Sequence, residues 1–501
     1  MTKYNRFLFI AFLIVLGKLS GLLKDILITF YHGVSNVTDA YFLSNSISSL
    51  LYMAVYSAVP VLVVPLYAGL AAEKSTSRTD TEMSAALVFL LVISACIALL
   101  VVRAAPSLVG VFSGDVDSDV KSLAISYLSI MALTFSFSTL VSFYNSIQTV
   151  NRVVLPSYIV PIFNNSIFCI GLLIFSSPAN FTSILFLGLM SWIVLSVVNF
   201  TIIRSEIVFR PSAALDLALN RRFVLLFLPA ALSFYIEQMN GFVGVYFASK
   251  LGLGAISIYS YSNKINMMVL SVFLVFLTAS MFPRMAAVNA VGERGEMNGY
   301  LVRCLRVIVM LSVPIVGFLH LYSNEIVELL FRRGNFTADD VEKVAMVLSV
   351  IVFALPFSLV RDTMNRVIFA RGSTVVPLLL ALLSLTVNIF IAYVTFRSFG
   401  LLGLAFAVVI STIVACVVVT SLVGGIIETN LLMVWMRMGF LSVSCAGAAY
   451  FLIYWMSTVT TVHWALLLFP YVMVYVLFLN ILRVPETQMV LRIVCGRLRR
   501  L

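Results

Sequence analysis

The stretch GKLSGLLKDILITFYHGVSNVTDAYFLSN, residues 17–45, decides the fold of this 501-residue chain. Its first half belongs to an apolar run over 7–31, which is long enough to span a membrane because roughly 20 residues cross the hydrocarbon core. Lys18, Lys24 and Asp25 lie inside that run. An ionised side chain that faces lipid at this depth costs several kcal/mol, so the charged face should look into a helix bundle or a watery cavity. We interpret it as the wall of a transport pathway.

The whole chain has the composition of an integral membrane protein, with 62% hydrophobic residues, 11% charged residues and a mean hydropathy of +1.09. Its net charge of +11 is spread through short loops, which indicates membrane topology and no nucleic-acid partner. The six cysteines lack zinc or disulfide spacing. The sequence contains no nucleophile, nucleotide-binding or metalloprotease motif, so we predict no enzyme, no cofactor and no metal site.

Apolar runs of spanning length predict an all-α polytopic membrane protein with about 14 transmembrane helices. The predicted spans are 7–31, 38–70, 83–105, 121–149, 154–176, 181–203, 223–249, 255–282, 300–322, 343–370, 376–396, 401–424, 434–456 and 464–483. With the N-terminus inside, the inner loops and the tail hold 20 lysines and arginines, whereas the outer loops hold six. The positive-inside rule therefore predicts that both termini are cytoplasmic.

Weak self-similarity at a spacing of about 220 residues indicates an internal repeat, because Asn45 and Pro65 recur as Asn263 and Pro283. Duplicated transporters place their substrate site between the repeats, so we predict two six-helix lobes around a central cavity. The predicted parts are an N-terminal lobe 1–205, an inner interfacial linker 206–222, a C-terminal lobe 223–425, and two additional helices with a basic cytoplasmic tail 426–501.

More charges lie within the predicted spans of the second lobe. Lys264 has two interpretations, a cavity-wall residue or a lysine that reaches the membrane interface. Asp362 and Arg366 are spaced i, i+4 and predict an ion pair, which would leave Arg361 unmatched. Positive charges outnumber negative ones in the predicted interior, so we expect an anionic ligand such as phosphate or pyrophosphate.

Four segments of the chain resemble the MviN/MurJ-type flippases of the multidrug/oligosaccharidyl-lipid/polysaccharide exporter superfamily. They are SGLLKDILITFYHGVSNVTDAYF (20–42), TVNRVVLPSYIVPIFNNS (149–166), LFRRGNFTADD (330–340) and FARGSTVVP (369–377). The third segment is the most specific, because hydropathy alone does not explain a Leu-Phe-x-x-Gly-x-Phe-Thr run before a charged helix start. The resemblance covers nearly all of the fourteen predicted helices.

The resemblance implies a flippase that moves an undecaprenyl-pyrophosphate-linked saccharide, either lipid II or a polysaccharide repeat unit, across the bacterial inner membrane by alternating access. The expected partners are this lipid-linked glycan and membrane lipid, with glycan-biosynthesis enzymes as candidate protein partners. Together with the interior charges above, the predicted site residues are Lys18, Lys24 and Lys264 for the pyrophosphate, and Asp25, Asp39, Arg361 and Arg366 for the cavity wall.

The chain departs from the family pattern in two of its helices. Tyr52 and Ser57 stand where lipid II flippases carry charge on the second helix, and Gly244 replaces an acidic residue thought to help bind sodium. Both departures favour a polysaccharide repeat unit over lipid II and count against a sodium site. Two other functions stay open: a cation-coupled small-molecule antiporter of the same superfamily, with Glu237 or Asp25 as its coupling site, and a scaffold or scramblase that recruits glycan enzymes. Glu237 also has a purely structural interpretation, as a carboxylate hydrogen-bonded between helices.

Overall fold

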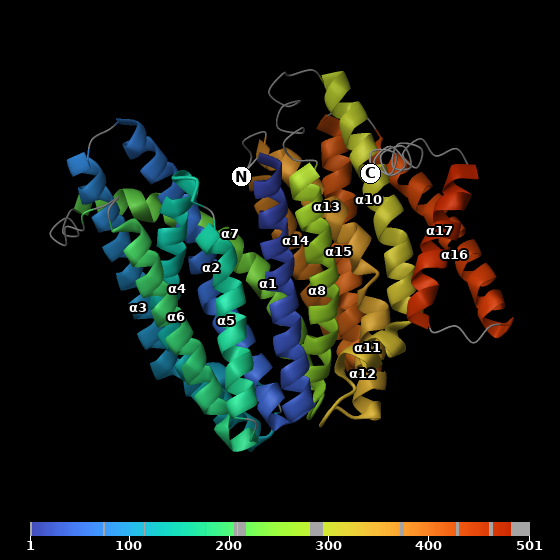
Figure 1. Cartoon of the computed structure of the whole chain (residues 1–501), viewed down its shortest axis with the longest axis horizontal. Helices are drawn as coiled ribbons and strands as arrows, with labels where there is room; N and C mark the ends of the chain where they lie inside the picture. The colour runs from blue at the N-terminus through green and yellow to red at the C-terminus, as the bar shows by residue number, and fades with distance from the viewer. Residues whose placement is uncertain are drawn as a thin grey trace. The chain divides into compact units, whose positions relative to one another are not determined.

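The computed structural model describes residues 3–73, 76–114, 116–153, 155–175, 177–204, 208, 217–280, 294–370, 375–426, 430–459 and 464–481. Within these ranges the protein consists of sixteen α-helices and one 3-10 turn, with no β-strand (Figure 1). The predicted all-α class is therefore confirmed. Most of the predicted linker, and the basic tail after residue 481, lie outside the described residues.

The chain forms two compact units, Met1–Ser260 with Phe331–Asp340, and Tyr261–Leu330 with Val341–Leu501. The first unit contains α1 (Lys3–His32), α2 (Asn36–Glu73), α3 (Thr76–Phe112), α4 (Ser118–Val150), α5 (Leu155–Ile174), the 3-10 turn η1 (Pro178–Asn180), α6 (Phe181–Ile203), α7 (Leu217–Ala248) and the start of α8 (Ala255–Ser280). The second unit contains the rest of α8, α10 (Arg294–Leu321), α11 (Ser323–Phe331), most of α12 (Ala338–Ile351), α13 (Ala354–Ala370), α14 (Val375–Phe399), α15 (Leu401–Ile426), α16 (Leu431–Val459) and α17 (Trp464–Ile481).

The two compact units are defined by contacts between helices, whereas the predicted lobes are defined by the internal sequence repeat. Helix α7 packs against α2 and α3 and so belongs to the first compact unit, although the repeat assigns it to the second lobe. The predicted division at 206–222 and the predicted central cavity stay predictions.

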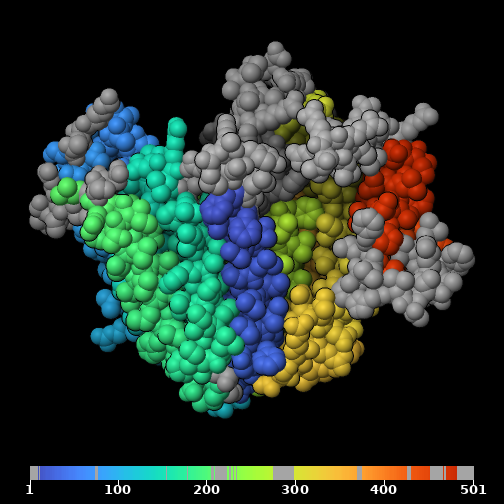
Figure 2. Space-filling view, viewed as in Figure 1, coloured from blue at the N-terminus to red at the C-terminus, as the bar shows by residue number. Residues whose placement is uncertain are grey.

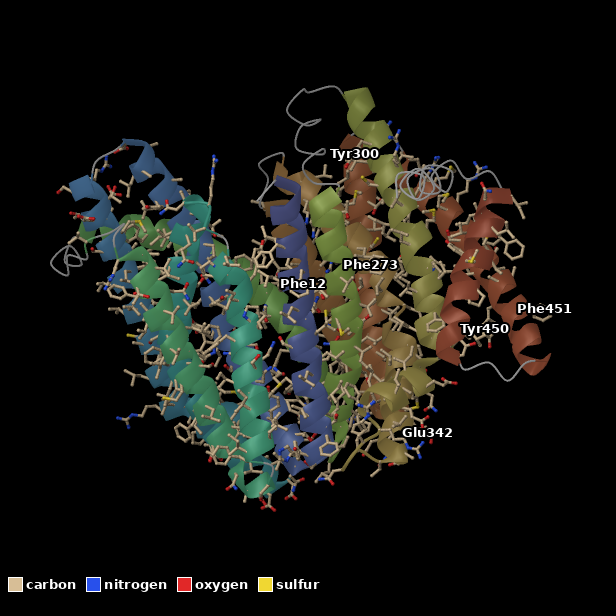
Figure 3. All side chains as sticks on the ribbon, in the orientation of Figure 1. Phe12, Phe273, Tyr300, Glu342, Tyr450 and Phe451 are labelled. Carbon is tan, nitrogen blue, oxygen red and sulfur yellow. The ribbon has the colours of Figure 1, made fainter. Side chains whose placement is uncertain are left out.

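Nine helices in the described part of the chain are long and apolar enough to cross a membrane, or ten if one bent pair counts as a single span. Large apolar side chains such as Phe12 on α1 and Phe451 on α16 are exposed (Figure 3). Surfaces of this kind would favour aggregation in water, but they match the hydrocarbon of a bilayer. The protein is therefore a multi-pass membrane protein, as its hydropathy predicts.

The predicted span 343–370 is not one helix. It consists of α12 and α13, which meet at a bend of 44°. Pro356 explains the break, because it has no N–H to donate to the carbonyl of Val352 and cannot continue the helical ladder. Hydropathy also gives no sign of α11, a nine-residue helix within the predicted outer loop 323–342.

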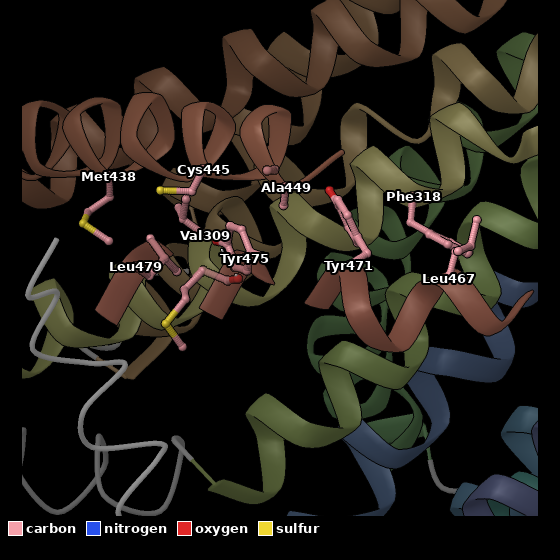
Figure 4. Close-up of a cluster of buried hydrophobic side chains, with 11 residues drawn as sticks. Val309, Phe318, Met438, Cys445, Ala449, Leu467, Tyr471, Tyr475 and Leu479 are labelled. Atoms are coloured by element: carbon pink, nitrogen blue, oxygen red, sulfur yellow. Dashed lines mark hydrogen bonds between the residues drawn. The ribbon is translucent and has the colours of Figure 1, made fainter. Parts of the chain in front are cut away.

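The two helices outside the predicted repeat are attached through a hydrophobic cluster on α10, α16 and α17 (Figure 4). Its members include Val309 on α10, Ala449 on α16, and Tyr471 and Tyr475 on α17. The Tyr475 hydroxyl donates a hydrogen bond to the carbonyl of Met310 at 3.0 Å. This bond satisfies the one polar atom of a large buried ring, so α17 can pack on α10 without an unpaired hydroxyl.

Candidate functional site

Helix α1 lies along α5 through a face of small residues. A Cβ added at Gly17 would lie 3.6 Å from Cγ of Pro161, and one added at Gly21 would lie 3.5 Å from Nδ2 of Asn165. Glycines four residues apart allow helices to approach closely, because side chains of α5 can lie directly against the backbone of α1. The side chains of α1 (blue) and α5 (teal) meet along this contact in Figure 2.

The same helix face carries Lys24, one turn after Gly21. Lys24 is half-buried, and its ammonium lies 5.5 Å from the centre of the Phe168 ring on α5. Tyr41, Asp25 and Cys169 are among its electrostatic neighbours. Lys18 is exposed and lies off this face, so the structure surrounds Lys24 with protein and leaves Lys18 at the surface of its unit.

Asp39 is buried at the start of α2, with 1% of its surface exposed. Its carboxylate accepts hydrogen bonds from the backbone N–H groups of Gly254 (2.6 Å) and Ser257 (2.8 Å), and from the Ser257 hydroxyl (2.5 Å). These donors form the N-terminus of α8, where a negative charge also interacts favourably with the helix dipole. Both carboxylate oxygens therefore cap α8, and the predicted place of Asp39 in a cavity wall stays a prediction.

The most specific family-like segment, LFRRGNFTADD, also has a structural explanation. Its loop, residues 331–340, packs on the C-terminal end of α1, where Asn335 donates from its backbone N–H to the carbonyl of Phe30 (2.9 Å) and from Nδ2 to that of Tyr31 (2.6 Å). Gly334 has a φ of +60° and contacts the Phe30 carbonyl, leaving no room for a Cβ. The loop therefore satisfies carbonyls that α1 cannot pair within itself.

A substitution at Gly334 should test this contact. We expect Gly334→Ala to lower the free energy of unfolding by about 2 kcal/mol, because alanine at positive φ is strained and its Cβ meets the Phe30 carbonyl. Gly400→Ala is the matched control, since Gly400 has a φ of +55° but open space around it. Thermal unfolding of the purified variants measures the difference, and equal losses in the two variants would mean that the loop contact contributes nothing.

The second unit contains Lys264, Arg361 and Arg366, all half-buried. The guanidinium of Arg361 pairs with the carboxylate of Asp362, at 2.9 Å from Nη2 and 3.0 Å from Nε. The prediction that Arg361 is left unmatched is therefore wrong, because its long side chain folds back onto the next residue along the helix. Lys18, Lys24, Asp25 and Asp39 belong to the first unit, so the predicted site residues divide between the two units.

Two of the three residues that depart from the family pattern, Tyr52 and Gly244, lie in contacts between helices. Tyr52 is buried, stacks on Phe135 at 4.2 Å between ring centres, and shares hydrogen bonds with Ser138 and Thr139 of α4. The ring of Tyr259 on α8 occupies the space beside Gly244 of α7 that a side chain would need. The hydroxyl of Tyr52 is therefore satisfied by a neighbouring helix, and the space beside Gly244 is occupied by the Tyr259 ring.

The close packing at Gly244 makes a second prediction. We expect Gly244→Ala to destabilise the protein by about 1–3 kcal/mol, since the added methyl group overlaps the buried Tyr259 ring. Gly241→Ala, on the same helix but with nothing within 4 Å of its Cβ position, should be neutral or slightly stabilising. Thermal unfolding of both variants checks this, and a neutral Gly244→Ala would contradict the packing described here.

Glu237 is exposed on α7, and its structural and coupling interpretations both stay predictions. Within the described residues, no group of three or more histidine, cysteine or carboxylate side chains is placed to hold a metal ion.

Membrane-spanning helices that carry half-buried charges define the class of this protein as a multi-pass membrane transporter. A family model described as lipid II flippase MurJ matches residues 28–475. The chain therefore belongs to the MurJ family of lipid II flippases.

Individual comparisons agree with this assignment. A probable lipid II flippase MurJ from Aquifex aeolicus is 23% identical over 411 residues, which cover 80% of this chain and 79% of the relative. A solved lipid II flippase MurJ in an inward closed conformation has the same fold, with a TM-score of 0.82 and 22% identity over 95% of this chain and 98% of the other. An inward-facing multidrug resistance MATE family transporter of the MOP superfamily matches less well, with a TM-score of 0.66 and 15% identity over 84% of this chain and 94% of the other.

Proposed function

We propose that this protein moves a polyprenyl-pyrophosphate-linked saccharide of the lipid II type from the cytoplasmic to the outer leaflet of a bacterial inner membrane, with both of its termini in the cytoplasm. The observation that carries the proposal is membership of the MurJ family over residues 28–475. Lys18, Lys24 and Lys264 bind the pyrophosphate, and Arg361 and Arg366 extend the basic wall. The polyprenyl chain stays in the surrounding lipid.

The environment of Lys24 supports an anionic headgroup. A half-buried ammonium is unfavourable in a low-dielectric setting unless a negative charge comes close to it. The Lys24 ammonium lies over the Phe168 ring, at 5.5 Å from its centre, and Tyr41 and Asp25 are among its electrostatic neighbours. A pyrophosphate would supply both the charge and several strong hydrogen-bond acceptors.

Of the two predicted cargoes, family membership favours lipid II. Tyr52 and Gly244 lie in contacts between helices, so the departures at these two positions have a packing explanation. A reconstituted system can compare the two directly. Purified full-length protein in proteoliposomes should translocate lipid II faster than an undecaprenyl-pyrophosphate-linked repeat unit, and translocation of neither above protein-free vesicles would overturn the proposal.

The antiporter alternative predicts a different result in the same vesicles. Cation-driven efflux of a cationic dye, abolished by Glu237→Gln, would favour it. The MATE transporter shares the fold of this chain, but at 15% identity that likeness carries no functional argument. We therefore expect no dye efflux, either from vesicles with the unmodified protein or from vesicles with the Glu237→Gln variant.

A further inference from the structure

Helix α2 carries a proline well inside its length. Pro60 lies between Asn36 and Glu73, the first and last residues of the helix. In an α-helix the N–H of residue 60 would donate to the carbonyl of residue 56. A proline has no N–H, so it leaves the Tyr56 carbonyl without its helical donor. A backbone carbonyl inside a membrane protein is unfavourable unless another donor reaches it.

The neighbouring helix α4 supplies that donor. The hydroxyl of Ser142 donates a hydrogen bond to the Tyr56 carbonyl at 3.1 Å, and only 3% of Ser142 is exposed. The hydroxyls of Thr139 and Ser146, next to it on α4, donate instead to carbonyls one turn back in their own helix, at 2.9 and 2.7 Å. Ser142 therefore donates across to α2 at the level of the proline.

The second unit contains the same arrangement. Pro314 lies inside α10 and leaves the carbonyl of Met310 without its helical donor. The Tyr475 hydroxyl of α17 donates to that carbonyl at 3.0 Å, and Tyr475 is 1% exposed. A proline in one helix thus meets a hydroxyl donor from a neighbouring helix in both units, with different residues and different helices. The recurrence indicates that these hydroxyls compensate for the prolines.

The part of α2 that precedes Pro60 is held in place. Asp39 caps the start of α8, and the Tyr52 hydroxyl shares a hydrogen bond with Thr139 of α4. Prolines inside helices are the usual sites of bending. A bend at Pro60 would therefore move the following part of α2 relative to a fixed first part.

A serine hydroxyl suits a bond that opens and closes. The O–H of Ser142 can turn from the Tyr56 carbonyl to the carbonyl of Ser138, one turn back in α4, an acceptor that serines in helices commonly use. A backbone N–H has no such freedom, because the peptide plane fixes its direction. The serine therefore keeps a hydrogen bond whether or not α2 bends.

We propose that Pro60 is a hinge of α2 in the transport cycle and that Ser142 is its positioning residue. The proline removes a hydrogen bond that would hold the helix straight, and the serine hydroxyl replaces this bond in the present conformation. The inference rests on the proposed function, since a hinge matters only if helices change their arrangement during transport.

A double-mutant cycle tests the role of Ser142. Ser142→Ala should lower the Tm of the detergent-solubilised protein by about 2–4 °C, because it leaves the Tyr56 carbonyl without a donor. In a Pro60→Ala background the restored N–H donates to this carbonyl, so Ser142→Ala should change the Tm by less than about 1 °C. Pro60 is exposed, so its replacement leaves no cavity. Equal losses in both backgrounds would overturn the role of Ser142.

Ser146→Ala is the matched control for this cycle. Ser146 is also 3% exposed and lies one turn further along α4, but its hydroxyl bonds within its own helix. Its replacement should change the Tm equally in the Pro60 and the Pro60→Ala backgrounds. A dependence on residue 60 as strong as that of Ser142→Ala would mean that the cycle reports general packing of α4, and would also overturn the assignment.

Translocation in proteoliposomes tests the hinge itself. Pro60→Ala should move the lipid-linked saccharide about 2- to 10-fold more slowly, the factor that corresponds to one net hydrogen bond broken on bending. Its Tm should not fall, because alanine favours the helix. Pro60→Gly, which restores the N–H but weakens the helix, should be faster than Pro60→Ala. If the unmodified protein translocates nothing, the proposed function fails; if it translocates and Pro60→Ala is equally fast, the hinge alone is refuted.

Discussion

Lys24→Met is expected to reduce translocation of the lipid-linked saccharide by about 10- to 100-fold, because a hydrogen bond to a charged group contributes roughly 1.5–3 kcal/mol. Methionine nearly keeps the length and the apolar contacts of the lysine side chain, so the loss reports the missing charge. The measurement is the initial rate of translocation in proteoliposomes that contain equal amounts of folded protein. Lys24→Arg should retain most of the rate, since arginine keeps the charge and also binds phosphate.

Lys250→Met is the matched control for this experiment. The Lys250 ammonium also lies over an aromatic ring, at 4.4 Å from the centre of Tyr246, but it follows the end of α7 in a predicted outer loop. Lys250 is half-buried, as Lys24 is, but lies outside the predicted pyrophosphate site. We therefore expect its translocation rate to stay within about twofold of the unmodified protein. Equal losses in Lys24→Met and Lys250→Met would indicate a general effect of lysine removal and would contradict the assignment of Lys24.

Asp39→Ala should produce the largest loss of stability among these variants. The substitution removes three hydrogen bonds to a buried carboxylate and leaves the N–H groups of Gly254 and Ser257 without their acceptor. We expect a loss of about 3 kcal/mol in the free energy of unfolding, since bonds to charged groups contribute roughly 1.5–3 kcal/mol each and their contributions overlap. Denaturant or thermal unfolding of the detergent-solubilised protein measures it.

Asp117→Ala controls for the loss of an acidic residue at a helix N-terminus. Asp117 is the N-cap of α4, is exposed and makes no capping hydrogen bond through its side chain. Its replacement should cost less than about 0.5 kcal/mol, as is typical of surface positions. A similar small loss in Asp39→Ala would show that the Asp39 contacts do not fasten α2 to α8.

The membrane character and the helical class follow directly from the sequence, because hydrophobic runs of spanning length have few other solutions. The charges of the first helix are equally visible, since a lysine at mid-membrane stands out against apolar neighbours. The family resemblance carried by LFRRGNFTADD is confirmed by the match over residues 28–475. Each of these features can be recognised within one continuous segment of the sequence, without knowledge of contacts between distant segments.

What the sequence does not give depends on contacts between distant segments. Arg361 pairs with the next residue, Asp362, which helical spacing does not single out, because side-chain length and rotamer decide whether adjacent residues can meet. Asp39 faces the start of α8, more than two hundred residues away in the chain, so helical periodicity cannot identify its partner. Phe168 looks like any other apolar residue of α5 until the packing of α1 brings Lys24 over its ring.

The break between α12 and α13 is indicated in the sequence by a proline, which hydropathy does not detect. Pro356 lies within the predicted span 343–370, and a proline inside a helix removes one hydrogen bond and favours a kink. Hydropathy is unaffected by proline at this position, so a count of apolar residues merges the two helices. Proline positions should therefore be read together with hydropathy when helix boundaries are predicted.

The central claim is that the half-buried ammonium of Lys24 is tolerated because an anionic headgroup binds it. The most direct test compares how far three lipids stabilise the purified protein against thermal unfolding: undecaprenyl pyrophosphate, undecaprenyl monophosphate and uncharged undecaprenol. A ligand at 100 times its dissociation constant adds about 2.7 kcal/mol to stability. We predict the greatest stabilisation by the pyrophosphate, little by the alcohol, and loss of the difference in Lys24→Met. Equal stabilisation by all three lipids, or a pyrophosphate effect unchanged in Lys24→Met, would contradict the account.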